Sequence, residues 1–173
     1  RDGSRGNELW DHIREVGKPM GLVPGHTSTI RRIEGGMLSY QADMDYTVNP
    51  FELGLGRLVD LEMDANFIGK EALKKIKSDG IKRSQVGIEI SCTPLKHPNT
   101  SYWPIMVGSE EVGYITSAVY SPRLDKNIAL AMMDVNHSAI DTAAETTTPE
   151  GNFPIKVVQK PFYDPKKKIT SGS

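Results

Sequence analysis

The sequence predicts an α+β fold, in which a helix-rich half is followed by an all-β half built as a small antiparallel barrel or sandwich. In the first 80 residues the apolar side chains recur at helical spacing, whereas after residue 82 they alternate with polar residues at a period of two. Glycine and proline separate the alternating segments, which is typical of several short strands. The period changes near residues 79–84. We therefore expect one part at 1–80, a second at 81–168 and a disordered tail at 169–173.

Two helices are predicted in the first 40 residues. Residues 8–16 carry apolar side chains at helical spacing, and Gly17 is suited to end that helix. Thr27 or Ser28 can cap a second helix that runs through Met37, because a hydroxyl can accept from the unpaired N–H groups of the first turn. The apolar residues of this second helix form one stripe that is expected to face the core. They are Ile30, Ile33, Met37 and Leu38.

The rest of the first half is predicted to hold a loop, a strand and a third helix. Residues 41–56 are rich in Asp, Asn, Pro and Gly, which favour turns. Residues 57–63 alternate apolar with polar side chains, which indicates a strand. The third helix is expected over about 69–78, with its alanine, leucine and isoleucine facing inward and Gly80 after its end.

Five strands are predicted in the second half. They cover residues 85–90, 104–107, 112–116, 127–134 and 154–159. Gly-Ser-Glu-Glu between the second and third of these is typical of a hairpin turn, so these strands should be antiparallel. Residues 137–152 are rich in threonine and alanine and are too long for a hairpin turn, so we expect a mobile surface loop there.

Composition limits the class of protein. The 173 residues carry 21 basic and 22 acidic side chains, which gives a net charge of −1. A nucleic-acid or anionic-membrane binder is usually basic, so this composition argues against both classes. The longest apolar run, residues 128–133, is far shorter than the roughly 20 residues that span a bilayer. Cys92 is the single cysteine, so no intrachain disulfide can form. We expect a soluble, most simply cytoplasmic protein, with no nucleic acid and no membrane as partner.

No catalytic or metal-binding motif is visible in the residue pattern. The four histidines have no metal-like spacing, and neither a glycine-rich phosphate loop nor G-x-S-x-G occurs. Cys92 is interpreted as a buried, inert thiol. Asp43 and Asp45 could share a metal, although loop aspartates more often form turns. We therefore predict no metal site.

Arg32 is the candidate binding residue that the pattern offers. If the apolar stripe of the second helix faces the core, Arg32 lies on its flank. The planar guanidinium is suited to a carboxylate or to the carbonyl of a pterin. A surface arginine or a structural salt bridge explains the same pattern.

Several blocks of the sequence together resemble the aminomethyltransferase family, whose type member is the T-protein of the glycine cleavage system. The blocks are residues 32–40 (Arg-Ile-Glu-Gly-Gly-Met-Leu-Ser-Tyr), 49–54 (Asn-Pro-Phe-Glu-Leu-Gly), 67–73 (Phe-Ile-Gly-Lys-Glu-Ala-Leu), 112–117, 120–122, 126–131 and 160–165 (Lys-Pro-Phe-Tyr-Asp-Pro). They are collinear over almost the whole chain. Ser-Tyr at 39–40 is most similar to the dimethylsulfoniopropionate demethylase branch.

The resemblance implies a ring-like fold of three domains with tetrahydrofolate in the central opening. Residues 1–80 would be the tail of an α/β folate-binding domain, and residues 81–168 the C-terminal β-barrel. Members of the family move a one-carbon unit from an amine or sulfonium donor onto N5 of the folate. The resemblance implies that Arg32 holds a carboxylate or the pterin, that Tyr40 borders the folate pocket and that Tyr120 adds the barrel's share of its wall.

The resemblance also implies that parts of the site lie outside this chain. The family's acid/base aspartate and pterin-binding glutamate belong upstream of residue 1, and Gln41 replaces the glycine that usually follows the tyrosine. We therefore expect the C-terminal part of a longer protein, with an exposed flank and no catalytic residue or activity of its own. The expected partners are the protein's own N-terminal domains and a small-molecule one-carbon donor or a lipoyl carrier protein.

Three alternative functions remain open at this point. The full-length protein could be a dimethylsulfoniopropionate demethylase. It could be a non-catalytic folate-binding relative linked to tRNA modification and iron–sulfur assembly, although Cys92 lies in Ile-Ser-Cys-Thr rather than in that branch's Lys-Gly-Cys-Tyr. It could also be the C-terminal folate module of a dimethylglycine or sarcosine dehydrogenase.

Overall fold

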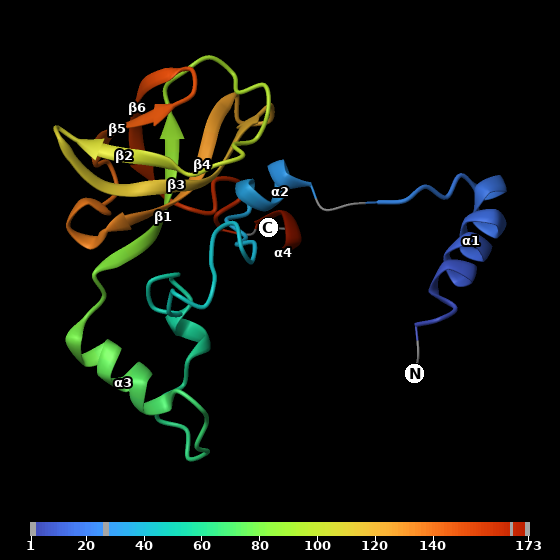
Figure 1. Cartoon of the computed structure of the whole chain (residues 1–173), viewed down its shortest axis with the longest axis horizontal. Helices are drawn as coiled ribbons and strands as arrows, with labels where there is room; N and C mark the ends of the chain where they lie inside the picture. Colours follow the sequence, from blue (N-terminus) through green and yellow to red (C-terminus); the bar gives the residue numbers. More distant parts are fainter. Residues whose placement is uncertain (1–2, 26–27, 167, 172–173) are drawn as a thin grey trace.

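A closed six-stranded antiparallel barrel forms the largest part of the molecule (Figure 1). The computed structural model describes residues 3–25, 28–166 and 168–171. The strands are β1 (Arg83–Ile90), β2 (Trp103–Val107), β3 (Glu110–Ser121), β4 (Lys126–Asp134), β5 (Ala143–Thr148) and β6 (Gly151–Val158). They close in the order β1-β4-β3-β2-β5-β6. The fold class is confirmed, and the barrel rather than the sandwich is the form it takes.

The barrel interior is a dry apolar core supplied by alternate residues of its strands. Ile88, Ile105 and Ile115 are fully buried there. Strand β4 is buried on both faces, because Ala129 and Ala131 point into the barrel while Leu130 packs outward under α2. This double burial explains why its sequence is a continuous apolar run rather than an alternating one.

The predicted hairpin is confirmed, and the predicted surface loop is wrong. β2 and β3 pair antiparallel through the turn that begins at Gly108. Residues 137–152 instead contain β5 and the start of β6, after a 3-10 turn at Val135–His137. β5 pairs with both β2 and β6 and thereby closes the barrel. It lacks large apolar residues, and the fully buried Thr146 donates to the carbonyl oxygen of Pro104 at 2.9 Å, so hydropathy alone could not reveal it.

The helices of the first half are shorter or less buried than predicted. They are α1 (Gly6–Gly17), the 3-10 turn at Lys18–Met20, α2 (Thr29–Glu34) and α3 (Lys70–Asp79). Ser28 caps α2 by accepting from Arg31 N at 3.3 Å, whereas Thr27 lies outside the described residues. α2 ends early because Gly36 adopts a φ of +64°. Met37 is consequently 57% exposed and leaves the predicted apolar stripe.

Two further predictions need correction. Residues 57–63 form no strand but a 3-10 turn at Gly56–Leu58 followed by bends. The carboxylate of Asp60 stabilises these bends by accepting from Glu62 N at 3.0 Å and from Met63 N at 3.1 Å. The predicted disordered tail begins with a short helix, α4 (Lys168–Ser171), and residues 172–173 lie outside the described part.

The expected exposed flank is present. Helices α1 and α3 stand apart from the barrel in Figure 1. The apolar face of α1, which consists of Leu9, Trp10, Ile13 and Val16, is between 46% and 61% exposed. No residue of α3 is buried, and of the inward face predicted for it Leu73 and Ile76 are half-buried while Ala72 is exposed.

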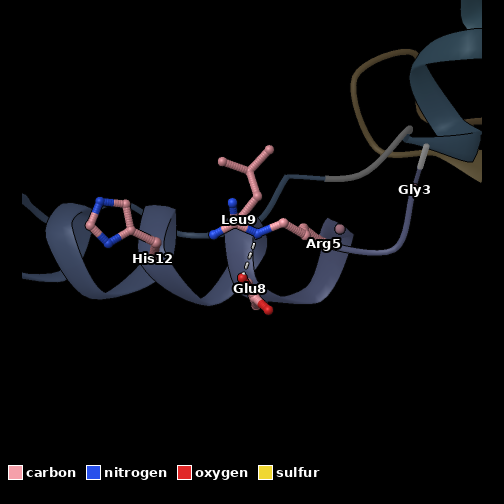
Figure 2. Close-up of a pocket in the computed structure, with 6 residues that line it drawn as sticks. Gly3, Arg5, Glu8, Leu9 and His12 are labelled. Carbon is pink, nitrogen blue, oxygen red and sulfur yellow. Dashed lines mark hydrogen bonds and ion pairs between the residues drawn. The ribbon is translucent and has the colours of Figure 1, made fainter. Parts of the chain in front are cut away.

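A hollow of about 590 Å³ beside α1 is an open surface rather than a site. Figure 2 shows that its lining comes from the first turns of α1 and the residues just before them. Arg5 Nε donates to Glu8 at 2.8 Å there, and both side chains are solvent-exposed.

No helix of the described part is long and apolar enough to cross a bilayer.

Candidate functional site

Helix α2 holds its polar residues against the outer face of the barrel. Ile33 is fully buried and packs in a second apolar cluster with Val119, Ile128 and Leu130. The carbonyl oxygen of the next residue, Glu34, accepts from the N–H groups of Phe162 and Tyr163, and so the C-terminal segment is tied to the same helix. This packing fixes the position of Arg32, the residue before Ile33.

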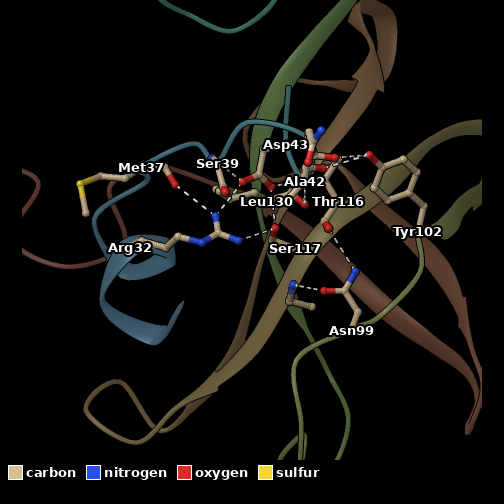
Figure 3. Close-up of polar contacts among 12 residues, drawn as sticks. Arg32, Met37, Ser39, Ala42, Asp43, Asn99, Tyr102, Thr116, Ser117 and Leu130 are labelled. Carbon is tan, nitrogen blue, oxygen red and sulfur yellow. Dashed lines mark hydrogen bonds and ion pairs between the residues drawn. The ribbon is translucent and has the colours of Figure 1, made fainter. Parts of the chain in front are cut away.

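Arg32 forms a nearly buried ion pair with Asp43 at the centre of this face (Figure 3). Arg32 Nη1 lies 2.6 Å from Asp43 Oδ2 and donates to the carbonyl oxygen of Met37 at 3.3 Å. Arg32 Nη2 donates to Ser117 Oγ on β3 at 2.8 Å. The guanidinium thus joins α2, the loop that follows it and the barrel.

Asp43 is surrounded by hydrogen-bond donors on both oxygens. Oδ2 also accepts from Ser39 N at 2.9 Å, while the hydroxyls of Thr116 and Ser117 lie 2.6 Å from Oδ1. An ionised carboxylate has about four acceptor sites, and this one meets four donor groups. A fully buried carboxylate is stable only when it is paired and hydrogen-bonded in this way. We name Arg32, Asp43, Thr116 and Ser117 the junction.

The junction assigns Arg32 and Asp43 a structural role that the sequence did not resolve. The sequence favours Asp43 as a turn residue or a metal ligand, and it does not indicate the pairing with Arg32. The sequence carries little signal for this ion pair, because the two residues are 11 positions apart and outside any helical register. The structural salt bridge weighed for Arg32 is the contact observed, while its role in holding a ligand stays a prediction.

Tyr40 is presented to solvent by the loop that the junction fixes. Its side chain is 62% exposed, and its neighbour Gln41 adopts a φ of +70°. This left-handed conformation is one that glycine adopts without strain, and glycine is the residue that the resemblance expects at this position. Tyr102 holds the loop from the barrel side, because its hydroxyl donates to the carbonyl oxygen of Ala42 at 3.0 Å.

Tyr120 lies in a separate hollow from Arg32 and Tyr40. That hollow is lined by Tyr120, Cys92 and Asp125 among others. The Tyr120 hydroxyl donates to Asp125 Oδ1 at 2.6 Å, and this hydrogen bond raises the pKa of the tyrosine. The structure therefore brings Arg32 close to the segment of Tyr40 but does not bring Tyr120 to them.

The remaining candidate residues have ordinary structural roles. Asp45 accepts from the amide and the hydroxyl of Thr47, and these hydrogen bonds lower the pKa of Asp45. Burial raises the pKa of Cys92, as expected for an unreactive thiol. Across the part of the chain that the structure describes, no group of three or more His, Cys, Asp or Glu side chains could hold a metal ion. His26 lies outside that part.

A cleft that the sequence did not indicate opens beside the loop that carries Tyr40. It measures about 680 Å³ and lies between the end of α2, residues 44–57 and the C-terminal segment. Lys160 lines it, and burial lowers the pKa of this lysine to about 8. A lone lysine before a proline carries no sequence signal for such an environment.

Comparison with family models and known proteins agrees with this geometry. Residues 83–164 match the model of the glycine cleavage T-protein C-terminal barrel domain, and residues 2–63 match the model of the GCVT N-terminal domain. The aminomethyltransferase of Bacillus pumilus (strain SAFR-032) is 36% identical over 158 residues, which are 90% of this chain and 42% of that protein. The aminomethyltransferase of Symbiobacterium thermophilum is 39% identical over 158 residues, 90% of this chain and 41% of the relative.

A solved structure shares the fold. The crystal structure of the glycine cleavage system aminomethyltransferase T from Bartonella henselae aligns with a TM-score of 0.70 at 21% sequence identity. The alignment covers 79% of this chain and 38% of that chain. The chain thus spans less than half the length of the relatives that it matches.

Proposed function

The chain belongs to the aminomethyltransferase family, the T-protein family of the glycine cleavage system, and from this premise we propose that it is the C-terminal part of a tetrahydrofolate-dependent one-carbon transferase. The whole protein would move a one-carbon unit from an amine donor to N5 of tetrahydrofolate. Because the matched relatives are more than twice as long, the activity is proposed for a longer protein and not for these 173 residues alone.

The junction is the observation that carries this proposal. It fixes residues 39–44 against the barrel through contacts to Asp43 from α2 and from β3, and it leaves Tyr40 on the outside. A rigidly held loop with an exposed aromatic ring can act as one wall of a pocket for a flat heterocycle. Transfer between two bound groups depends chiefly on such positioning, which is worth several powers of ten in rate.

The residues present fit one side of a tetrahydrofolate site. The exposed ring of Tyr40 can stack on the pterin, and Arg32 uses three of its five N–H groups internally, so that two remain for a carbonyl or carboxylate. Bound tetrahydrofolate would supply N5, the nucleophile that takes up the one-carbon unit. This chain's residues would orient the cofactor, while the acid/base group would come from the N-terminal part of the protein.

The apolar face of α1 supports the N-terminal domains of the same protein as a partner. Four apolar side chains, half-exposed in this chain, would be covered when the rest of the domain packs on that helix.

The donor would be a small amine or a group on a lipoyl carrier protein. A dimethylsulfoniopropionate demethylase is the second candidate, supported by Ser-Tyr at residues 39–40. We further propose a cytoplasmic location, in keeping with a single free cysteine.

Tetrahydrofolate binding to the full-length protein tests the proposal. Tyr40→Ala should weaken binding about tenfold, because stacking of a flat base on an aromatic ring is worth roughly 1–3 kcal/mol. Tyr46→Ala is the matched control, since Tyr46 is 90% exposed in the same loop and should change the dissociation constant less than about twofold. Isothermal titration calorimetry measures both. Equal effects of the two variants would exclude Tyr40 from the pocket.

A second measurement addresses the enzyme itself. The 173-residue chain alone should give no turnover of any one-carbon donor, whereas the full-length protein should convert a lipoyl-bound aminomethyl group. Turnover by the isolated chain would contradict the proposed division of the site. Conversion of dimethylsulfoniopropionate in place of the aminomethyl group would establish the demethylase instead.

A further inference from the structure

The cleft beside Lys160 combines apolar walls with positive charge. Its walls include Met37, Leu38, Met44, Leu53 and Leu55. Among the described residues that line it, Arg57 and Lys160 are charged and none is acidic. A volume of about 680 Å³ lies in the range of small-molecule sites. The cleft is therefore large enough for an organic ligand and electrostatically suited to an anion.

Lys160 has no directly bonded counter-ion among the described residues. Within the described ranges its ammonium makes no hydrogen bond or ion pair, although most of the side chain is buried. The carboxylate that attracts it is Asp43, and both oxygens of Asp43 are already occupied by Arg32, Ser39 N and two hydroxyls of β3. Little of the negative charge of Asp43 is therefore left to neutralise the ammonium of Lys160.

An unpaired, desolvated ammonium is costly to the folded protein. Burial disfavours the charged form and lowers the pKa of Lys160 to about 8, so the side chain is still mostly protonated at pH 7. A bound anion would relieve this cost, because it supplies the counter-charge that the protein does not. Arg57, on the same lining, would add a second positive charge.

We infer that this cleft binds an organic carboxylate with an apolar body, the carboxylate against Lys160 and Arg57 and the body against the methionine and leucine walls. The inference concerns side chains of this chain only. It does not depend on one-carbon transfer, so its failure would leave the proposed function untouched.

Lysine side-chain NMR of the full-length protein tests the inference, with benzoate as the probe. One Cε signal, identified by its loss in Lys160→Met, should titrate near pH 8 in the free protein. Saturating benzoate should raise that pKa toward the ordinary value of about 10.4. Benzamide, which lacks the charge, and glycine, which lacks the apolar body, should leave it unchanged.

Affinity gives an independent readout. The dissociation constant for benzoate should be on the order of 1 mM, as is usual for a ligand of this size. Because the protonated lysine binds the anion, affinity should be about tenfold weaker at pH 9 than at pH 7. Lys160→Met should abolish this pH dependence and Lys160→Arg should preserve binding. Arg57→Gln should weaken binding several-fold.

Exposed Lys96 offers the matched control, and Lys96→Met should bind benzoate like the wild type. The inference is overturned if Lys160→Met binds benzoate as tightly as the wild type. It is equally overturned if benzamide or glycine binds as well as benzoate, or if benzoate leaves the pKa of Lys160 unmoved.

Discussion

The barrel and the region before it are stabilised in different ways. Strands β1 to β6 enclose a core in which Ile88, Ile105 and Ile115 are fully buried, and every strand has two hydrogen-bonded neighbours. In α1 and α3, by contrast, a single residue, Gly17, is buried. The barrel buries its own apolar surface, whereas the apolar face of α1 is about half-exposed in this chain. The difference indicates that the barrel has a core of its own, and it is consistent with the proposal above that the rest of the protein would cover α1.

The junction is where the two regions meet. Arg32 and Asp43 come from the first region, and Thr116 and Ser117 from the barrel. The contact is polar and geometrically demanding, so it sets the position of the loop at 39–44 more strictly than apolar packing would.

Breaking the junction should have the largest effect. Asp43→Ala leaves a nearly buried arginine without its counter-ion and should lower the free energy of unfolding by about 3–5 kcal/mol. Urea denaturation measures the loss. Asp43→Asn, which keeps the acceptor oxygen, should lose less and serves if the alanine variant does not fold. Exposed Asp45 is the control. If Asp43→Ala lowers the free energy of unfolding no more than Asp45→Ala does, the junction does not stabilise the fold.

The same substitution in each region tests whether the two regions contribute differently to the free energy of unfolding. Ile115→Ala empties part of the barrel core and should cost about 3 kcal/mol. Ile13→Ala on α1, where the side chain is 46% exposed, should cost less than about 0.5 kcal/mol. Trp103, buried in the barrel, reports unfolding by fluorescence once Trp10 is replaced by Phe. Similar losses at both positions would show that α1 packs against something in this chain.

The smallest expected effect concerns the backbone of the loop. Gln41 has a φ of +70°, which costs a non-glycine residue roughly 1–2 kcal/mol. Gln41→Gly should therefore raise the free energy of unfolding by about 0.5–1 kcal/mol, after the greater freedom of glycine in the unfolded chain is subtracted. The control Ala42→Gly, without positive φ, should be neutral or destabilising in thermal melts. A destabilising Gln41→Gly would contradict the strain assigned to this position.

The sequence alone determined the elements whose pattern is local. The helical spacing in residues 8–16, the turn between β2 and β3 and the apolar run in β4 each depend on residues close together in the sequence, and all three elements are present in the structure. Periodicity failed in two ways: β5 carries no regular apolar pattern, and residues 57–63 carry one but form no strand. β5 is stabilised by pairing on both sides and by the buried hydroxyl of Thr146, and residues 57–63 are bent by Asp60 despite their alternation.

Only the tertiary structure decided the chemistry of the site. The sequence indicated Arg32 by its place on a helix flank, but its partner Asp43 lies in an irregular loop and its partner Ser117 is 85 residues away. The charge environment of Lys160 likewise depends on burial beside an already occupied Asp43, a residue far from it in the sequence. Spacing encodes which residues share one face of an element. It does not encode which loops meet, because those contacts depend on the whole folded chain and on how it excludes water.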